Sequence, residues 1–286
     1  MTVGVLVMAY GTPRDREDVA TYYTDIRRGR PPTPELLADL VRRYDAIGGT
    51  FPLRAITDRQ IDALASVLGP DYVVTLGTKH SVPRIEDGLE TLAAQGVSRT
   101  VGLVLAPHYS RFSIGEYAAR AGDTVDTIES WHLLPAYVSF LSRAVTEALG
   151  RVPPGSEVVF TAHSLPERIL ATGDPYPSQL ADTAAAVADE AGLSTWSVAW
   201  QSAGRTPEPW LGPDVLDVLR ARAADGAPGV VVCACGFVAD HLEVAYDLDI
   251  EAAALAAELG LPFARTASVN DDESVMRALA ALVAER

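Results

Sequence analysis

Cysteine is scarce in this 286-residue chain, and the two that occur, Cys233 and Cys235, are separated by a single alanine. In an extended strand, residues two apart share a face, with Cα atoms roughly 6.6 Å apart and parallel side chains. That is poor geometry for a disulfide. We therefore expect both residues to be buried and reduced, which favours a cytoplasmic location.

Long apolar runs and an excess of positive charge are also lacking. The longest apolar run, residues 229–239, is far shorter than the ~20 residues of a membrane-spanning helix. The amino terminus enters an apolar stretch without a basic region, so no export signal is predicted. The net charge of −15 argues against nucleic-acid binding, which depends on Lys and Arg neutralising phosphates.

What the chain does contain is a regular alternation of apolar strand-like and amphipathic helical segments. This alternation predicts parallel sheets built from βαβ units, and the length suggests two domains. Strands are predicted at 3–9, 72–77, 100–106, 126–131, 157–162, 195–200, 229–235 and 261–265. Helices are predicted at 15–28, 33–45, 55–68, 85–95, 113–122, 134–149, 175–191, 212–223, 239–258 and 272–284.

Two kinds of segment occur once in each half, in the same order. Residues 3–13 and 158–166 each combine an apolar strand with alanine, a ring side chain, a small residue and then proline. Residues 101–109 and 230–237 form the second pair. We interpret the chain as two similar α/β halves whose strand ends contribute to one cleft.

An acidic run follows the predicted strand 229–235. Glu243, Asp247 and Glu251 are spaced i, i+4 and i+8, which puts all three on one face of a helix. Taken alone, such a run is usually a solvated acidic face. Its place after the carboxyl end of a strand is where α/β proteins bind ligands, so we regard it as a candidate site.

At seven stretches the chain resembles the ferrochelatases, most of all the water-soluble coproporphyrin ferrochelatases of Gram-positive bacteria. The stretches run from near the amino terminus into the last quarter of the chain, in order. They are LVMAYGTP (6–13), YYTDIRRGR (22–30), RYDAIGG (43–49), AHSLP (162–166), WQSAG (200–204), WLGPDV (210–215) and GFVADHLE (236–243).

The resemblance implies two Rossmann-like, chelatase-type domains, each a parallel sheet flanked by helices, with the active site in the cleft between them. The expected division is 1–140 for the first domain with its porphyrin-binding loop and 141–266 for the second with the metal-binding residues. A helix in 267–286 is expected to pack back on the first domain.

The implied activity is that of a lyase in haem biosynthesis, inserting Fe²⁺ into coproporphyrin III without an organic cofactor. His163 and Glu243 are implied to take the pyrrole protons and coordinate the incoming metal, and Asp247 and Glu251 to extend a carboxylate path to the surface. Tyr10 is implied to lie across the ring, where its phenol oxygen can become an axial ligand. The other implied substrate contacts are Arg27, Arg43, Tyr44, Phe51 and Tyr117.

Three further expectations follow from the family. Some members hold an iron–sulfur cluster on four cysteines, which two cysteines cannot supply, so no cluster is expected. A transient contact with the next enzyme of the haem pathway is implied. Lys79 and His80 match a pair near an outer metal site, with a catalytic and a structural role equally open.

Several alternatives remain open from the sequence. Relatives usually have serine where this chain has Phe51, so one polar contact to a propionate is missing and protoporphyrin IX is an alternative substrate. Another metal is a further alternative. A porphyrin- or haem-binding carrier without turnover would have the same fold, but it would not need the base that His163 and Glu243 provide.

Overall fold

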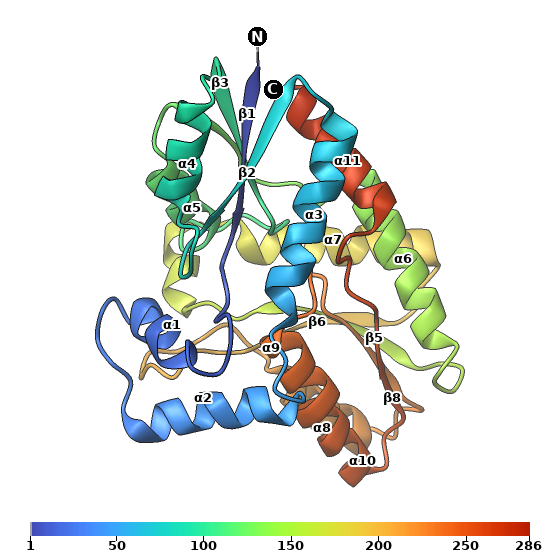
Figure 1. The fold of residues 1–286 in the computed structure, drawn as a ribbon. Helices are drawn as coiled ribbons and strands as arrows, with labels where there is room; N and C mark the ends of the chain where they lie inside the picture. Colours follow the sequence, from blue (N-terminus) through green and yellow to red (C-terminus); the bar gives the residue numbers. More distant parts are fainter. Residues whose placement is uncertain (1) are drawn as a thin grey trace.

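Two four-stranded parallel sheets flanked by helices make up the structure, a computed structural model that describes residues 2–286 (Figure 1). The strand order is β2-β1-β3-β4 in the first sheet and β6-β5-β7-β8 in the second. Each half thus places its first strand between its second and third. The predicted α/β class with two Rossmann-like halves is confirmed, and the repeated segments of the sequence lie on corresponding strands, β1 with β5 and β3 with β7.

All strands are short and pair in parallel. The first sheet consists of β1 (Val3–Ala9), β2 (Tyr72–Thr78), β3 (Arg99–Val104) and β4 (Val125–Ile128). The second consists of β5 (Glu157–His163), β6 (Trp196–Gln201), β7 (Val230–Cys233) and β8 (Phe263–Arg265). The central strands are buried on both faces because helices cover both sides of each sheet, and this explains their continuous apolar sequence.

Helices connect the strands. In the first half they are α1 (Val19–Ile26), α2 (Pro34–Ala46), α3 (Pro52–Leu68), α4 (Ile85–Ala94) and α5 (Ile114–Ala121). The helix α6 (Pro135–Leu149) connects the two halves. The second half contains the 3₁₀ helix η1 (Glu167–Thr172), α7 (Tyr176–Ala191), α8 (Val215–Ala224), α9 (Leu242–Val244), the π-helix η2 (Ala245–Ala252), α10 (Ala253–Leu259) and α11 (Glu273–Ala284).

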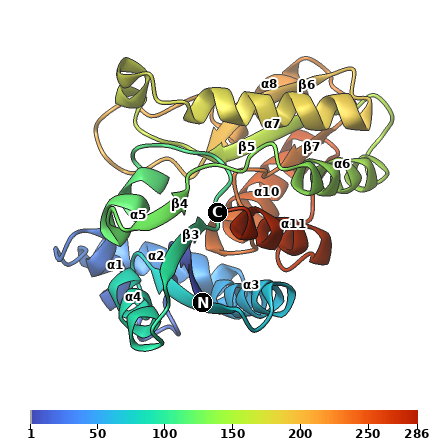
Figure 2. The same cartoon turned by 90° about the horizontal axis from the view of Figure 1, so that it is seen from above.

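The two halves share a hydrophobic core. One cluster joins Val5 and Val7 of the first sheet to Phe160 and Val231 of the second. Seen from above, α11 lies near the middle of the molecule between α3 and α6, and it contacts both (Figure 2). Residue 140, where the sequence analysis ends the first domain, lies inside α6, which contacts α7, β7 and β8.

Two predicted helices differ from the observed ones. The helix predicted at 15–28 begins only at Val19, because Asp15 and Asp18 accept hydrogen bonds from nearby backbone N–H groups and hold a turn instead. The helix predicted at 239–258 begins at Leu242 and becomes a π-helix over Ala245–Ala252. No proline or glycine marks that change, so the sequence pattern did not predict it.

The two cysteines are free and buried, as predicted. Cys235 lies beyond the end of β7, in a turn where its N–H donates to the Cys233 carbonyl. Among residues 2–286, no helix is long and apolar enough to cross a membrane.

Candidate active site

His163 is the last residue of β5, and its surroundings fix which ring nitrogen carries a proton. The Nδ1 atom lies 2.5 Å from the Ser164 carbonyl oxygen, which can only accept, so Nδ1 carries the hydrogen. The neutral ring therefore has its free lone pair on Nε2. The Tyr176 hydroxyl donates to the His163 carbonyl over 3.0 Å and holds the backbone at this position.

Glu243 faces that lone pair. One of its carboxylate oxygens, Oε1, lies 3.7 Å from Nε2 of His163, and the two side chains keep 42% and 35% of their surface exposed. Glu243 lies in the first turn of α9, where His241 is the N-cap. The Nδ1 atom of His241 accepts from the Glu243 and Val244 N–H groups over 3.1 and 3.3 Å. His241, as the N-cap, thus orients Glu243, the candidate catalytic carboxylate.

Each member of the His163–Glu243 pair shifts the other's titration. Burial acts to lower the pKa of His163, but the charge of Glu243 and its interaction with the ring outweigh it, so the pKa is raised. Burial acts to raise the pKa of Glu243, but His163, His241 and Arg43 outweigh it, so the pKa lies well below its usual range. The pair therefore combines an ionised carboxylate with an imidazole whose pKa is raised by that carboxylate.

The π-helix carries the next two acidic residues of the run. Asp247 is buried and accepts from the Ser202 hydroxyl over 2.5 Å, while Arg43 of α2 lies 3.6 Å from its other oxygen. Within residues 2–286 that other oxygen, Oδ1, accepts no hydrogen bond. Ser202 adopts a left-handed backbone conformation with φ of 59°, a strained geometry typical of functional sites. Glu251, one turn further, is exposed.

Burial dominates the titration of Asp247. It raises the pKa to about 7, and the charges of Glu243 and Glu251 act in the same direction. The Ser202 hydrogen bond and the nearby Arg43 charge favour the carboxylate form, but they do not outweigh burial. Among the described residues, no three His, Cys, Asp or Glu side chains converge in a geometry that could hold a metal ion.

Tyr10 follows the end of β1 and belongs to the same site. Its side chain is among the exposed large apolar ones, at 44%, and its ring lies 4.6 Å from that of His80 between centroids. Partial burial, followed by the charges of Glu243, Glu116 and Asp25, raises the pKa of the phenol well above its usual value. The phenol of the first half is therefore within electrostatic reach of Glu243 in the second.

Two predicted substrate contacts of the first half, Tyr44 and Phe51, form an aromatic wall. Tyr44 is buried and stacks on Phe51 with ring centroids 4.4 Å apart and planes 28° apart. Tyr117 on α5 is also buried, and the Lys79 ammonium lies 5.5 Å from its ring centre. Burial, with a smaller contribution from the charge of Glu243, raises the pKa of Tyr44.

The two predicted arginines lie in different surroundings. Arg43 lies on α2 and faces the π-helix: it contacts Asp247 and Asp39, and its guanidinium lies 4.8 Å from the Tyr246 ring centre. Arg27 ends α1, donates to the Arg30 carbonyl over 3.2 Å, and lies 5.8 Å from the Tyr23 ring centre. Within residues 2–286, neither Arg27 nor Glu251 has a hydrogen bond or ion pair with another predicted site residue.

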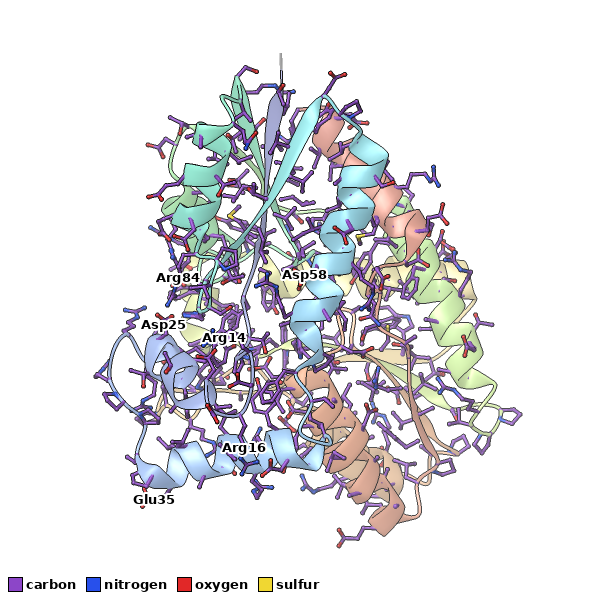
Figure 3. The ribbon with its side chains drawn as sticks, viewed as in Figure 1. Arg14, Arg16, Asp25, Glu35, Asp58 and Arg84 are labelled. Atoms are coloured by element: carbon purple, nitrogen blue, oxygen red, sulfur yellow. The ribbon has the colours of Figure 1, made fainter. Side chains whose placement is uncertain are left out.

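Beside Tyr10, the sequence indicated His80 but not its partner Asp25 or the neighbouring Arg84. The Asp25 carboxylate lies 2.7 Å from Nδ1 of His80 and accepts from Arg84 over 2.8 Å, and Figure 3 shows Asp25 and Arg84 close together. The Arg84 hydrogen bond is the main reason that the pKa of Asp25 is lowered. Asp25 comes from α1, whereas His80 and Arg84 come from the loop between β2 and α4, so no local spacing in the sequence could indicate that Asp25 joins them.

A cavity of about 480 Å³ lies elsewhere in the second half. Its lining includes Asp240, Asp249, Arg151 and Arg265, and none of the predicted site residues. The candidate site is thus defined by converging side chains and not by this cavity.

Comparison with known proteins gives a consistent result. The family model described as ferrochelatase matches residues 2–286. Coproporphyrin III ferrochelatase of Halalkalibacterium halodurans is 43% identical, over 99% of this chain and 97% of that protein. Coproporphyrin III ferrochelatase of Geobacillus thermodenitrificans is 45% identical, over 100% of this chain and 96% of that protein. Among solved structures, SirB from Bacillus subtilis with Fe³⁺ matches with a TM-score of 0.55 at 12% identity, covering 100% of this chain and 95% of SirB. That likeness concerns the fold.

Proposed function

The chain belongs to the ferrochelatase family and is a lyase, and on that basis we propose that it inserts Fe²⁺ into coproporphyrin III to give iron coproporphyrin III. The observation that carries the proposal is the orientation of His163, whose free Nε2 lone pair faces the ionised carboxylate of Glu243. Insertion replaces two pyrrole N–H bonds by bonds to iron and releases two protons. A base aimed at the reacting centre is therefore required.

In this proposal His163 accepts a pyrrole proton on Nε2, and Glu243 stabilises the imidazolium that forms. The pair passes this proton to solvent and then takes the second pyrrole proton in the same way, and the same two side chains offer a nitrogen and an oxygen to the entering Fe²⁺. Carboxylate oxygens suit a hydrated divalent cation in transit. We assign Asp247 and Glu251 to the route between this pair and the surface.

The positive charge of Arg43 beside Asp247 opposes the passage of a cation along that route. A guanidinium 3.6 Å from the carboxylate competes with any cation that approaches it. In the proposed reaction Arg43 therefore moves toward substrate as iron passes, which would reconcile its contact with Asp247 with its predicted role as a substrate contact.

On the other side of the ring, we assign Tyr10 to the axial position of the product iron. The raised pKa of its phenol means that it enters the reaction as a neutral group. Tyr44, Phe51 and Tyr117 would contact the porphyrin, and Arg27 would contact a propionate, since guanidinium groups pair with carboxylates in a bidentate manner.

The remaining expectations from the sequence enter the proposal as well. The first domain is taken as 1–140, the second as 141–266, and the last segment as 267–286. We propose a cytoplasmic location, which the two buried, free cysteines support, and we propose neither an organic cofactor nor an iron–sulfur cluster. The product would pass to the next haem-pathway enzyme through a transient contact.

Protoporphyrin IX is the second candidate substrate, because Phe51 presents an apolar ring at the wall where relatives usually have a hydroxyl. An anaerobic assay with Fe²⁺ and each porphyrin in turn distinguishes the two. We expect a higher kcat/KM for coproporphyrin III. A higher value for protoporphyrin IX would contradict the substrate assignment, and tight binding of both without insertion would indicate a carrier.

A further inference from the structure

The segment between β8 and α11, residues 266–272, crosses behind the turn that precedes Glu243. Its backbone pairs with this part of the second half at two points: the Thr266 N–H donates to the Val232 carbonyl over 3.0 Å, and the Asn270 N–H donates to the Val238 carbonyl over 2.8 Å. The segment thus lies against the chain immediately before Asp240 and His241.

Asn270 and Asp240 form a reciprocal pair of hydrogen bonds. The Asn270 Nδ2 donates to the Asp240 carboxylate over 2.9 Å, and the Asp240 N–H donates to Oδ1 of Asn270 over 2.9 Å. The Ser268 hydroxyl donates to the other Asp240 oxygen over 2.9 Å. One side chain therefore fixes both the backbone and the side chain of Asp240.

The residue held in this way leads directly to the catalytic pair. Asp240 precedes His241, whose ring caps α9 and accepts from the Glu243 N–H. Arg265 also ties Asp240 to Asp249 of the π-helix, at 3.2 and 2.6 Å. The position of Glu243 relative to His163 thus depends on the turn that Asn270 anchors.

Asn270 also connects this turn to the first half of the molecule. Its carbonyl accepts from Nε2 of Gln60 on α3 over 2.8 Å, and the neighbouring Asp271 pairs with Arg59 at 3.1 Å. α3 begins just after Phe51, which belongs to the aromatic wall. The backbone of Asn270 has φ of 47°, a left-handed conformation that asparagine tolerates better than most residues. Both the side chain and the backbone geometry therefore favour asparagine here.

We propose that Asn270 is a positioning residue for iron insertion, which holds Glu243 opposite His163 through Asp240 and His241. This inference rests on the proposed function. The two possible roles of Asn270 have different consequences. A residue that only anchors the loop would affect stability alone. A positioning role lowers turnover while porphyrin affinity stays unchanged.

A residue exchange tests the pair. Asn270→Asp places two carboxylates against each other, and Asp240→Asn loses the ionic acceptor; each single variant should lower kcat about 10- to 100-fold, as is typical for residues that orient metal ligands. The double variant with both changes again has one amide and one carboxylate and can form both hydrogen bonds, the side-chain one now donated by the amide at position 240, although the charge that Arg265 contacts there is lost. Its kcat should recover to within a few-fold of wild type, with the Kd for coproporphyrin III unchanged throughout.

Two further variants keep the test independent of folding. Asn270→Gly retains the left-handed backbone and removes the side chain, so kcat should fall as in the other single variants. Asp272→Ala, two residues away, removes the N-cap of α11, where Asp272 accepts from the Ser274 and Val275 N–H groups. It should lower the unfolding temperature and leave kcat unchanged.

A wild-type kcat in Asn270→Gly, or a double variant no faster than Asn270→Asp, would overturn the inference. Failure of the wild-type protein to insert iron in the same assay would instead contradict the proposed function.

Discussion

The Nε2 atom of His163 lies 3.7 Å from Oε1 of Glu243, although the two residues are 80 positions apart in the chain and belong to different segments of the second half. Because Nδ1 donates to the Ser164 carbonyl, the base and the carboxylate meet through one defined nitrogen. That relationship determines how the pair should titrate.

The first prediction concerns the pKa of His163. Since the negative charge of Glu243 raises it, we expect the ring to titrate above about pH 6.5, the usual value for histidine. Glu243→Gln removes that charge, and burial then lowers the pKa below the usual value. NMR titration of the five histidines measures this directly. His80, which pairs with Asp25, serves as the control and should not move; an unchanged His163 titration would show that the two side chains do not interact.

Arg27→Ala should weaken coproporphyrin III binding. One exposed charge pair contributes about 0.2–1 kcal/mol, so Kd should rise about 1.4- to fivefold, and the difference should shrink at high salt. Arg220→Ala, which removes an exposed arginine paired with Asp217 on α8, is the matched control. Equal affinities of wild type and Arg27→Ala at low salt, by fluorescence titration, would place the propionates elsewhere.

Asp247→Asn should change how stability depends on pH. The carboxyl has its ordinary pKa of 3.8 in the unfolded chain and about 7 in the folded protein, so the folded state holds the proton more strongly. The protonated Asp247 carboxyl therefore contributes stability that is fully present below pH 3.8 and is lost as the pH rises through 7. The loss is at most about 4 kcal/mol, at 1.36 kcal/mol per pKa unit.

An asparagine cannot ionise, so wild type should lose more stability than Asp247→Asn between pH 5 and pH 8. Urea unfolding at both pH values measures the difference. Parallel losses in the two proteins would mean that Asp247 is ionised in the folded state throughout this range.

Tyr10→Phe distinguishes an axial ligand from a packing residue. The change keeps the ring and removes only the phenol oxygen, and the side chain is 44% exposed, so stability should be unchanged. The absorption spectrum of the iron coproporphyrin complex should shift because a phenol ligand is lost. Superimposable spectra of wild type and Tyr10→Phe would exclude Tyr10 as the ligand.

The sequence predicted those features that depend on local pattern or on family motifs. The apolar strands and their parallel pairing follow from the alternation of strand-like and helical segments, the two similar halves follow from segments that recur in each half, and His163 and Glu243 follow from the motifs around them. It could not predict contacts between distant segments, such as Asp25 with His80, Arg43 with Asp247, or Asn270 with Asp240. These contacts are set by how the segments pack together. The π-helix was also missed, since the residue types at 245–252 do not distinguish a π-helix from an α-helix.

Anaerobic insertion of Fe²⁺ into coproporphyrin III by wild type and His163→Ala tests the central claim most directly. General acid–base catalysis contributes about 10²–10⁴-fold, so the variant should lose at least about a hundredfold in rate while it still binds the porphyrin. His132→Ala, which removes a histidine near Asp182, should insert iron at the wild-type rate. A near-normal rate in His163→Ala would contradict the account.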